Sequence, residues 1–174
     1  MKWLRVFIIF VLMAGSVAKI SYAAGEERFI FSDLTATDKV TGLMWTRDAN
    51  IAKKGKGMTW GTDGSMIWKE TFKFIEKLNK QKYAGHNDWR LPKKEELQTI
   101  VGYAKKKQRY EIELSEVLKK LGFKNVNSTF YWSSTVYAGT DYTDAAWGAF
   151  VDVGVMGYYD KTFFYYVWPV RSGQ

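Results

Sequence analysis

The 174-residue sequence contains no cysteine, one histidine and two prolines. The absence of cysteine excludes disulfides, catalytic thiols, thiolate metal sites and lipid attachment through a cysteine. The single histidine, His86, excludes a metal centre with several histidine ligands, and no Gly-x-Ser-x-Gly segment supports a Ser-His-Asp arrangement. We therefore expect stability from packing alone and no catalytic activity. An unrecognised hydrolase is the alternative, with a carboxylate pair such as Asp141 and Asp144, or Asp152 and Asp160.

Long apolar runs are also scarce, and the one that stands out covers residues 6–18. Lys2 and Arg5 precede it, and Ser21-Tyr22-Ala23 follows it as a small-x-small cleavage motif. This pattern predicts a signal peptide over residues 1–23 and export of the chain. An uncleaved membrane anchor is the alternative, although the run is short for a bilayer span. Residues 24–174 are predicted to form one domain.

Positive charge is concentrated in the middle of the chain. The formal charge of +8 falls to +5 once Lys2, Arg5 and Lys19 are removed with the signal. Residues 66–124 hold fifteen Lys or Arg against eight Asp or Glu, whereas residues 129–174 hold two against four. The densest cluster is Lys105, Lys106, Lys107 and Arg109, with Lys119, Lys120 and Lys124 as further candidates. Such a face favours anionic partners such as sulfated glycans, lipopolysaccharide or nucleic acid. A solvated face that keeps the chain soluble is the alternative.

The first two thirds of the domain predict short strands followed by helices. Strands are expected at residues 29–33, 35–38 and 43–47, the first at a sheet edge, with Gly42 supplying the positive φ of a hairpin turn. Residues 50–65 predict a loop anchored by Trp60. Apolar spacing predicts helices over residues 67–79, 92–104 and 113–121, the last ended by Gly122. The buried stripe of the first helix is predicted to be Trp68, Phe72, Ile75 and Leu78.

The last third is rich in aromatic residues: residues 130–174 hold fourteen of the thirty in the chain. Strands are predicted at residues 130–135, 145–153 and 163–171, with residues 154–160 as a hairpin connection. Pro169 cannot donate to a sheet ladder, so the last strand should lie at an edge or carry a bulge. The predicted fold is α+β, with two to three helices packed on a twisted, mostly antiparallel sheet.

The segment from His86 to Leu97 is predicted to be a strand-to-helix junction. Pro92 suits the first helical position, and Glu95 and Glu96 then lie near the positive end of the helix dipole. We expect Trp89 to be buried and Arg90 to brace the junction, with Asp88 as its nearest candidate partner. The alternative is that Arg90 binds an anionic ligand.

Four motifs occur in order along the chain. They are Thr41-Gly42-Leu43-Met44-Trp45; Asn87-Asp88-Trp89-Arg90-Leu91-Pro92 with Glu96-Leu97; Tyr131-Trp132-Ser133-Ser134; and Pro169-Val170-Arg171. Over residues 29–171 they resemble the bacterial family of the C-terminal domain of a collagen-like surface adhesin. The resemblance implies a C-type-lectin-like topology, a periplasmic or cell-surface location, and binding of sulfated polysaccharides. The related formylglycine-generating enzymes depend on cysteines, so their activity does not carry over. We assign to the scaffold Trp45, Asp88, Trp89, Arg90, Leu91, Pro92, Trp132, Ser133, Ser134 and Arg171.

The candidate ligand-binding residues are the cations Lys105, Lys106, Lys107 and Arg109 and the tyrosines Tyr137, Tyr142, Tyr158 and Tyr159. Tyrosine rings stack on sugar faces, although the same rings would equally complete a core and its rim. No cofactor is predicted; calcium is an alternative at Asp141 and Asp144, but the Glu-Pro-Asn triplet of calcium-dependent lectins is absent. The predicted function is an exported, non-enzymatic module that binds a glycan or sulfated polysaccharide. The alternative is an accessory of a pilus or envelope complex that binds a protein partner. No specific nucleic-acid partner is expected, and no transmembrane segment after signal cleavage.

Overall fold

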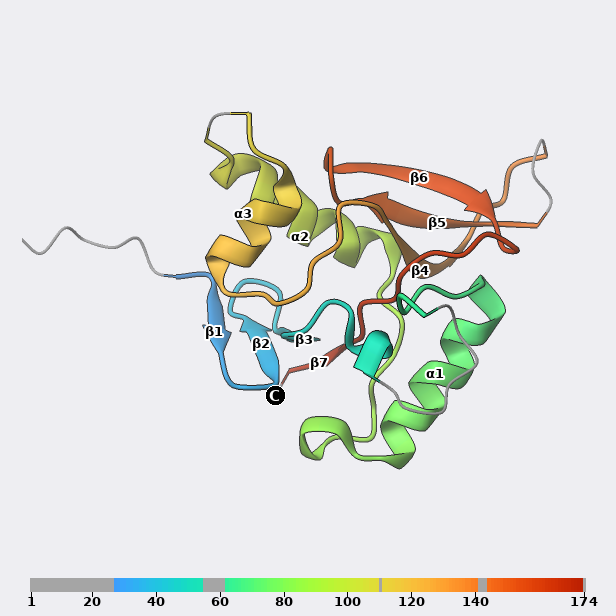
Figure 1. The fold of residues 1–174 in the computed structure, drawn as a ribbon, viewed down its shortest axis with the longest axis horizontal. Coiled ribbons are helices and arrows are strands. Elements are labelled where there is room, and N and C mark those ends of the chain that lie inside the picture. The colour runs from blue at the N-terminus through green and yellow to red at the C-terminus, as the bar shows by residue number, and fades with distance from the viewer. Residues whose placement is uncertain (1–26, 55–61, 110, 141–143, 174) are drawn as a thin grey trace, which may run out of the picture.

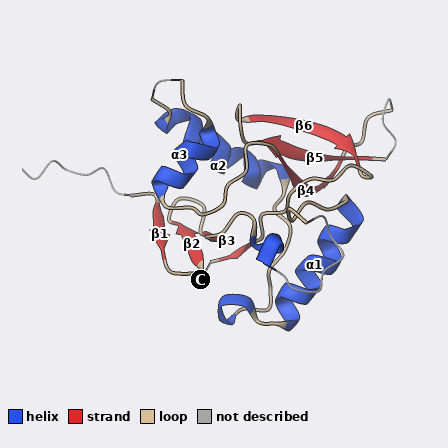
Figure 2. Ribbon diagram, viewed as in Figure 1, coloured by secondary structure: helices blue, strands red, loops and turns tan. Residues whose placement is uncertain are grey.

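The computed structural model describes residues 27–54, 62–109, 111–140 and 144–173, so the predicted signal, Trp60, Asp141 and Tyr142 lie outside the described residues. The chain is α+β, as predicted (Figures 1 and 2). The helices are α1 (Trp68–Lys80), α2 (Lys94–Lys107) and α3 (Leu114–Leu121), with short 3-10 turns η1 (Ile51–Lys54) and η2 (Tyr83–Gly85). The strands are β1 (Phe29–Phe31), β2 (Thr35–Asp38), β3 (Leu43–Thr46), β4 (Phe130–Val136), β5 (Ala145–Phe150), β6 (Val155–Asp160) and β7 (Val170–Ser172). Within the described ranges, every helix is too short or too polar to cross a membrane.

The strands form two antiparallel sheets, not the single sheet that the sequence predicted. One sheet has the order β1-β2-β3-β7, and the other has the order β4-β5-β6. The hairpin between β2 and β3 turns at Gly42, whose φ of +69° confirms the predicted turn glycine. The C-terminal strand β7 returns to pair with β3, which places Arg171 opposite Met44. The first and last motifs of the chain therefore lie side by side.

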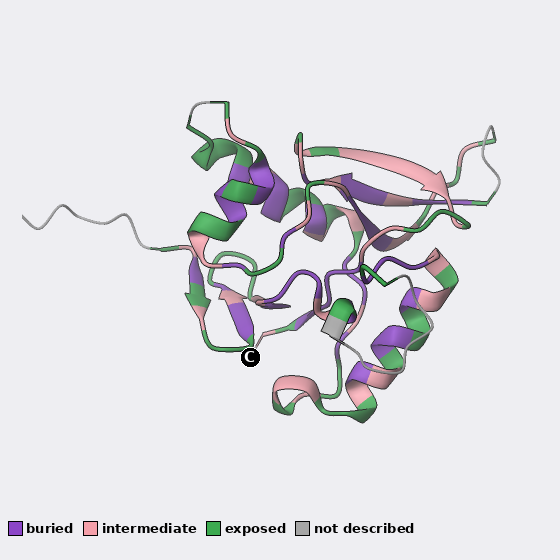
Figure 3. Ribbon diagram, in the orientation of Figure 1, coloured by how far each residue is buried: buried purple, intermediate pink, exposed green. Residues whose placement is uncertain are grey.

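Two clusters of buried side chains hold the layers together, and both contain fully buried tryptophans. The first joins α2, α3 and the four-stranded sheet through Trp45 and Trp168, whose ring centroids are 5.5 Å apart. The second joins α1 to the three-stranded sheet through Phe74 and Trp132. Figure 3 shows β4 and β5 buried along most of their length. Because successive residues of a strand face opposite sides, Tyr131 enters the first cluster while its neighbour Trp132 enters the second.

The stripe predicted for the first helix is partly wrong. Ile75 and Leu78 are buried, but Phe72 is 42% exposed, and the remaining buried positions are Thr71 and Phe74. The Phe72 ring packs edge-on against Trp68 at 4.6 Å, outside the core. The helix is rotated relative to the prediction because Phe74 reaches the tryptophans of the second cluster.

Helix α2 also differs from the prediction, since it runs over Lys94–Lys107 and does not begin at Pro92. The carbonyl of Pro92 accepts the backbone N–H of Ser134 at 2.8 Å, which keeps Pro92 in an extended segment against β4. Lys93, with ψ of 160°, is the N-cap, and Glu95 and Glu96 occupy the first turn as expected.

The C-terminal strands required the largest corrections. The segment predicted as a hairpin connection, residues 154–160, is mostly strand β6, and the turn lies just before it, with Gly154 at φ +70°. Residues 163–169 are not a strand, because Tyr165 bonds to Met66 and Tyr166 bonds to β4 as the chain crosses from one sheet to the other. The strand proper is β7, directly after Pro169, and it lies at a sheet edge as predicted.

Candidate functional site

The junction before α2 is built around Trp89, which is 2% exposed. Its indole N–H donates to the carbonyl of Tyr83 at 2.9 Å. The Asn79 side chain bonds both the backbone N–H and the backbone C=O of Trp89, at 2.8 and 2.9 Å. The buried tryptophan therefore has its polar groups satisfied, and it ties the end of α1 to the junction.

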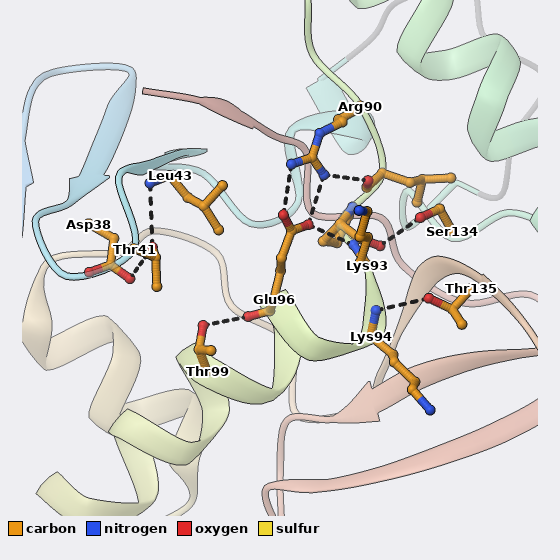
Figure 4. Close-up of polar contacts among 12 residues, drawn as sticks. Asp38, Thr41, Leu43, Arg90, Lys93, Lys94, Glu96, Thr99, Ser134 and Thr135 are labelled. Atoms are coloured by element: carbon orange, nitrogen blue, oxygen red, sulfur yellow. Dashed lines mark hydrogen bonds and ion pairs between the residues drawn. The ribbon is translucent and has the colours of Figure 1, made fainter. Parts of the chain in front are cut away.

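Arg90 pairs with Glu96 and not with Asp88, so the predicted partner is wrong. Nη1 and Nη2 of Arg90 donate to the two Glu96 carboxylate oxygens at 2.8 and 2.7 Å (Figure 4). Glu96 also accepts the backbone N–H of Lys93 at 2.7 Å. The chain turns into α2 after Pro92, and the first helical turn brings Glu96 back beside Arg90. The ion pair occupies the guanidinium N–H groups that an anionic ligand would need. The arrangement therefore favours a structural role for Arg90 over ligand binding.

Asp88 instead binds Arg171 of β7, whose Nε and Nη2 donate to its carboxylate at 2.6 and 3.1 Å. Strand register is the reason, because Arg90 and Val170 exchange two backbone hydrogen bonds of 2.8 and 3.0 Å. That pairing brings Asp88 and Arg171 together at the edge of the sheet. The ion pair thus joins the second motif of the chain to the last one.

Both ion pairs lower the pKa of their acids. Burial acts to raise the pKa of Glu96, but hydrogen bonds from Arg90 and from the Lys93 backbone outweigh it, and the pKa lies below its usual value. The hydrogen bond from Arg171 is the main influence on Asp88, and it lowers the pKa of that carboxyl. Each acid therefore stabilises the fold while it is ionised.

The Tyr-Trp-Ser-Ser motif fastens β4 to its surroundings. Trp132, fully buried, donates its indole N–H to the Met66 carbonyl at 3.1 Å. The Ser133 hydroxyl donates to the Trp147 carbonyl at 2.8 Å, and the Ser134 backbone holds Pro92. These residues form the frame of the domain.

The cationic cluster lies at the C-terminal end of α2, where it is divided around the helix. Lys106 lines a hollow between α2 and the β2–β3 turn, whereas Lys107 lines a second hollow together with Arg109. Lys105 lies near the turn before β6, beside Gly154. Adjacent helical residues point about 100° apart, so three consecutive lysines cannot share one face.

Two cations that are distant in the sequence complete the group. Lys120 of α3 lines the second hollow, of about 390 Å³, which has an apolar floor of Ile112, Val117 and Leu121. Arg28, just before β1, borders Lys106 across the first hollow. We call Arg28, Lys106, Lys107, Arg109 and Lys120 the basic surface.

Tyr103 lies at the centre of the basic surface. The Arg28 guanidinium carbon is 4.8 Å from its ring centroid, and the Lys107 ammonium is 5.5 Å away, both within cation–π range. Asp38 fixes Arg28 in a two-point ion pair, with Nε and Nη2 of Arg28 donating to Oδ1 and Oδ2 at 2.8 and 2.5 Å, so most of the Arg28 charge is neutralised. Burial acts to raise the pKa of Asp38, but hydrogen bonds from Arg28, Thr41 and the Val40 backbone lower it overall.

Besides Asp38, which pairs with Arg28, two acidic residues of the described ranges line the hollows around the basic surface. Glu95 lines the hollow that holds Lys106, and Glu27 lines a small hollow between Arg28 and Lys120. No acidic side chain is among the described residues that line the 390 Å³ hollow. Lys119, a further candidate in the sequence, pairs with Glu116 at 2.7 Å, so part of its charge is neutralised.

The candidate tyrosines lie elsewhere and are largely packed on one another. Tyr137 and Tyr158 stack with centroids 3.8 Å apart, and Trp147 meets both rings edge-on. The ammonium of Lys94, at the start of α2, lies 4.6 Å from the Trp147 ring. Tyr159 faces the opposite side of β6 and packs against the core residue Phe130 at 5.2 Å, which places it in the scaffold.

The structure does not bring the two sets of candidates into one site. The aromatic cluster of Tyr137, Trp147 and Tyr158 lies at the start of α2, whereas four of the five cations of the basic surface lie near its end. Fourteen residues of helix span about 21 Å. A small ligand would therefore contact one set or the other.

Neither metal nor carboxylate chemistry gains support from the described residues. Asp144 pairs with Lys161 at 2.7 Å, and no three His, Asp or Glu side chains within the described ranges are grouped to hold a metal ion. The hypothetical pair of Asp152 and Asp160 is wrong, because the two residues lie at opposite ends of the β5–β6 hairpin. Six strand residues span roughly 20 Å, well beyond the separation of glycosidase carboxylates.

Sequence reasoning missed Arg28, Tyr103 and Gly102, which lines the same hollow as Lys106. Arg28 and Tyr103 carry no local signal, because only the fold places them beside α2 and α3. Gly102 does carry one, since a glycine inside a helical pattern suggests a packing or functional reason.

The fold and these surfaces define a small α+β domain with a framework of four motifs and a basic surface at one end of α2. The model of the Lcl C-terminal domain family matches residues 34–171. The chain therefore belongs to the Lcl C-terminal domain family, as the four motifs indicated. A comparison with curated proteins found no match. The C-type-lectin-like topology stays a prediction.

Proposed function

We propose that the protein is an exported, non-enzymatic module that binds an anionic polysaccharide through its basic surface. The observation that carries the proposal is the convergence of Lys107 of α2 and Lys120 of α3 around Tyr103, whose ring Arg28 also contacts. The resemblance of the four motifs to the C-terminal domain of a collagen-like adhesin, which implies binding of sulfated polysaccharides, supports the same direction. The predicted signal peptide supports a location in the periplasm or at the cell surface.

The chemistry of the surface suits sulfate or carboxylate groups spaced along a polymer. Lys107, Arg109 and Lys120 line one hollow with no acidic residue among its described lining. Exposed cations attract a polyanion through long-range steering and release of counterions, so the affinity should fall steeply with salt. The ring of Tyr103 adds an aromatic contact beside these charges.

The test is the binding of heparin, used as a sulfated polysaccharide probe, to residues 24–174 by titration calorimetry. Lys107→Gln combined with Arg109→Gln removes two charges from the basic surface. The double variant should bind heparin at least tenfold more weakly in low salt. The slope of log affinity against log salt should flatten by about one to two units, roughly one for each lost contact.

The matched control is Lys69→Gln combined with Lys73→Gln, which removes the same charge from exposed positions on α1. If both double variants lose the same affinity, net charge alone governs binding and the basic surface is not a site. Addition of a chelator tests the calcium alternative, which requires that binding disappear.

A protein partner is the second candidate, favoured by one observation. Phe163 and Phe164, which follow β6, are 51% and 58% exposed, and adjacent exposed aromatics are common at protein interfaces. Capture of an envelope protein by wild type, but not by Phe163→Ser/Phe164→Ser, together with no binding to heparin, would favour this candidate.

A further inference from the structure

A groove runs along α2 beside the basic surface. It has a volume of about 480 Å³ and lies between the helix and the β2–β3 turn. Gln98, Gly102 and Lys106 form its helical wall, and because they are spaced four residues apart they lie in one line along the helix. Val40 and Thr41 form the opposite wall.

Gly102 has no evident role in the fold. It lies inside a fourteen-residue helix, where glycine is the least favourable residue after proline. A Cβ atom placed on it meets nothing within 4 Å, and its φ does not lie in the left-handed region. Neither packing nor backbone conformation therefore requires glycine at this position.

The missing side chain opens the groove onto the helix backbone. Glycine allows a ligand to approach a backbone closely, and here it does so between the amide of Gln98 and the ammonium of Lys106. The lining also includes Glu95 and Thr41, whose hydroxyl donates to Asp38 and can still accept a hydrogen bond. These groups offer both hydrogen-bond donors and acceptors, which suits a ligand with many hydroxyl groups and one acidic group near Lys106.

We propose that this groove seats a sugar unit of the bound polysaccharide, with Gly102 as its floor and Lys106 contacting an acidic substituent. The inference rests on the proposed function and adds to it a site that binds the sugar ring itself, beside the charged groups of the polymer. Val40, 74% exposed, offers an apolar contact to the C–H face of a sugar ring.

The test compares Gly102→Leu with Gly102→Ala. Alanine and leucine are both strong helix formers, so both variants should unfold at higher urea concentrations than wild type. Only leucine extends a side chain into the groove. The probes are heparin, heparin that has been desulfated and N-acetylated, and poly-L-glutamate, which has carboxylates but no sugar.

We expect Gly102→Leu to bind both heparin forms at least tenfold more weakly than wild type, and Gly102→Ala to stay within about threefold. The slope of log affinity against log salt for heparin should flatten by no more than about one unit in Gly102→Leu, because only the Lys106 contact is lost with the sugar unit. The Lys107→Gln/Arg109→Gln variant should flatten the slope for heparin by about one to two units, and it should lose more affinity for heparin than for the desulfated form, which keeps its carboxylates but has no sulfates.

Wild-type affinity of Gly102→Leu for both heparin forms would overturn the groove while leaving the polyanion proposal standing. Poly-L-glutamate binding that equals heparin binding and is lost in Gly102→Leu would also overturn it, because the groove would then accept any acidic polymer. Failure of the wild-type domain to bind any probe would overturn both proposals.

Discussion

The ion pair between Arg90 and Glu96 gives the sharpest prediction about stability. Glu96 has 18% of its side chain exposed and Arg90 has 37%, so the pair lies at the boundary between core and solvent. In Arg90→Ala, Glu96 keeps the Lys93 backbone N–H as a donor but loses both guanidinium bonds. A half-buried carboxylate would then lack its counter-charge at the start of α2.

The magnitude follows from this geometry. Hydrogen bonds to charged groups contribute about 1.5–3 kcal/mol, and the exposure of Arg90 argues for discounting that range. We expect Arg90→Ala to lower the free energy of unfolding by about 1–2 kcal/mol. For a domain of this size each kcal/mol lowers the unfolding temperature by roughly 2–4 °C. A double-mutant cycle with Glu96→Gln should recover a coupling of about 1 kcal/mol between the two side chains.

The pH dependence supplies an independent check. The pKa of Glu96 in the folded protein lies below the ordinary value of 4.5. The contribution of the ionised Glu96 to the free energy of unfolding is therefore complete above pH 4.5, and it is lost as pH falls through the pKa of the folded state. Urea unfolding followed by tryptophan fluorescence should show the full difference between wild type and Arg90→Ala at pH 7. The difference should shrink below pH 4.5. Equal urea midpoints for wild type and Arg90→Ala at pH 7 would refute a stabilising role of the ion pair. A difference in stability that stays unchanged down to pH 3 would mean that packing of the aliphatic part of Arg90, and not its charge, stabilises the fold.

Two further predictions concern the sheets. In Gly148→Ala the new Cβ would lie 2.2 Å from the Tyr131 carbonyl oxygen, so the strands must shift, and urea unfolding should show a loss of about 1–3 kcal/mol. Asp38→Asn removes the charged partner of Arg28, and its loss of stability, also about 1–3 kcal/mol, should be complete at pH 7. Because the pKa of Asp38 is lowered from 3.8, that loss should diminish as pH falls below this value; a loss independent of pH would contradict the assignment.

Local signals predicted much of the fold. Gly42 and Gly122 mark a hairpin turn and a helix end because both positions take a positive φ, at +69° and +120°. The paired glutamates predicted the first turn of α2 for the same kind of local reason, since carboxylates favour the positive end of a helix dipole.

The errors arose where tertiary contacts decide. Strand β6 begins directly after Gly154 and contains Gly157, so its glycines looked like turn residues. It is a strand because β5 offers a full ladder of partners. Residues 163–169 have strand composition, but they cross from one sheet to the other and make only isolated bridges to Met66 and Tyr131. Composition does not reveal which partners a segment finds in the fold.

The candidate site shows the same division between local and tertiary information. Three consecutive lysines predicted a basic region, but helical geometry directs them to different sides. The fold brings the candidate Lys120 beside Lys107 and adds Arg28, which the sequence did not indicate. The partner of Arg90 was misjudged for a related reason. Asp88 is nearer in sequence, but the turn after Pro92 brings Glu96 to Arg90. The pairing of Arg90 with Val170 brings Arg171 to Asp88.

Helix α2 connects stability to binding, since its first turn carries the brace and its last turn carries the cations. Glu96 and Lys107 are eleven residues apart, about 16 Å along the helix. Substitutions at such a separation usually act independently. Arg90→Ala should therefore lower the unfolding temperature yet leave heparin affinity within about twofold of wild type at temperatures where the domain is folded. A larger loss of affinity would mean that the brace sets the position of the whole helix, and that the basic surface depends on the junction for its geometry as well as for its stability.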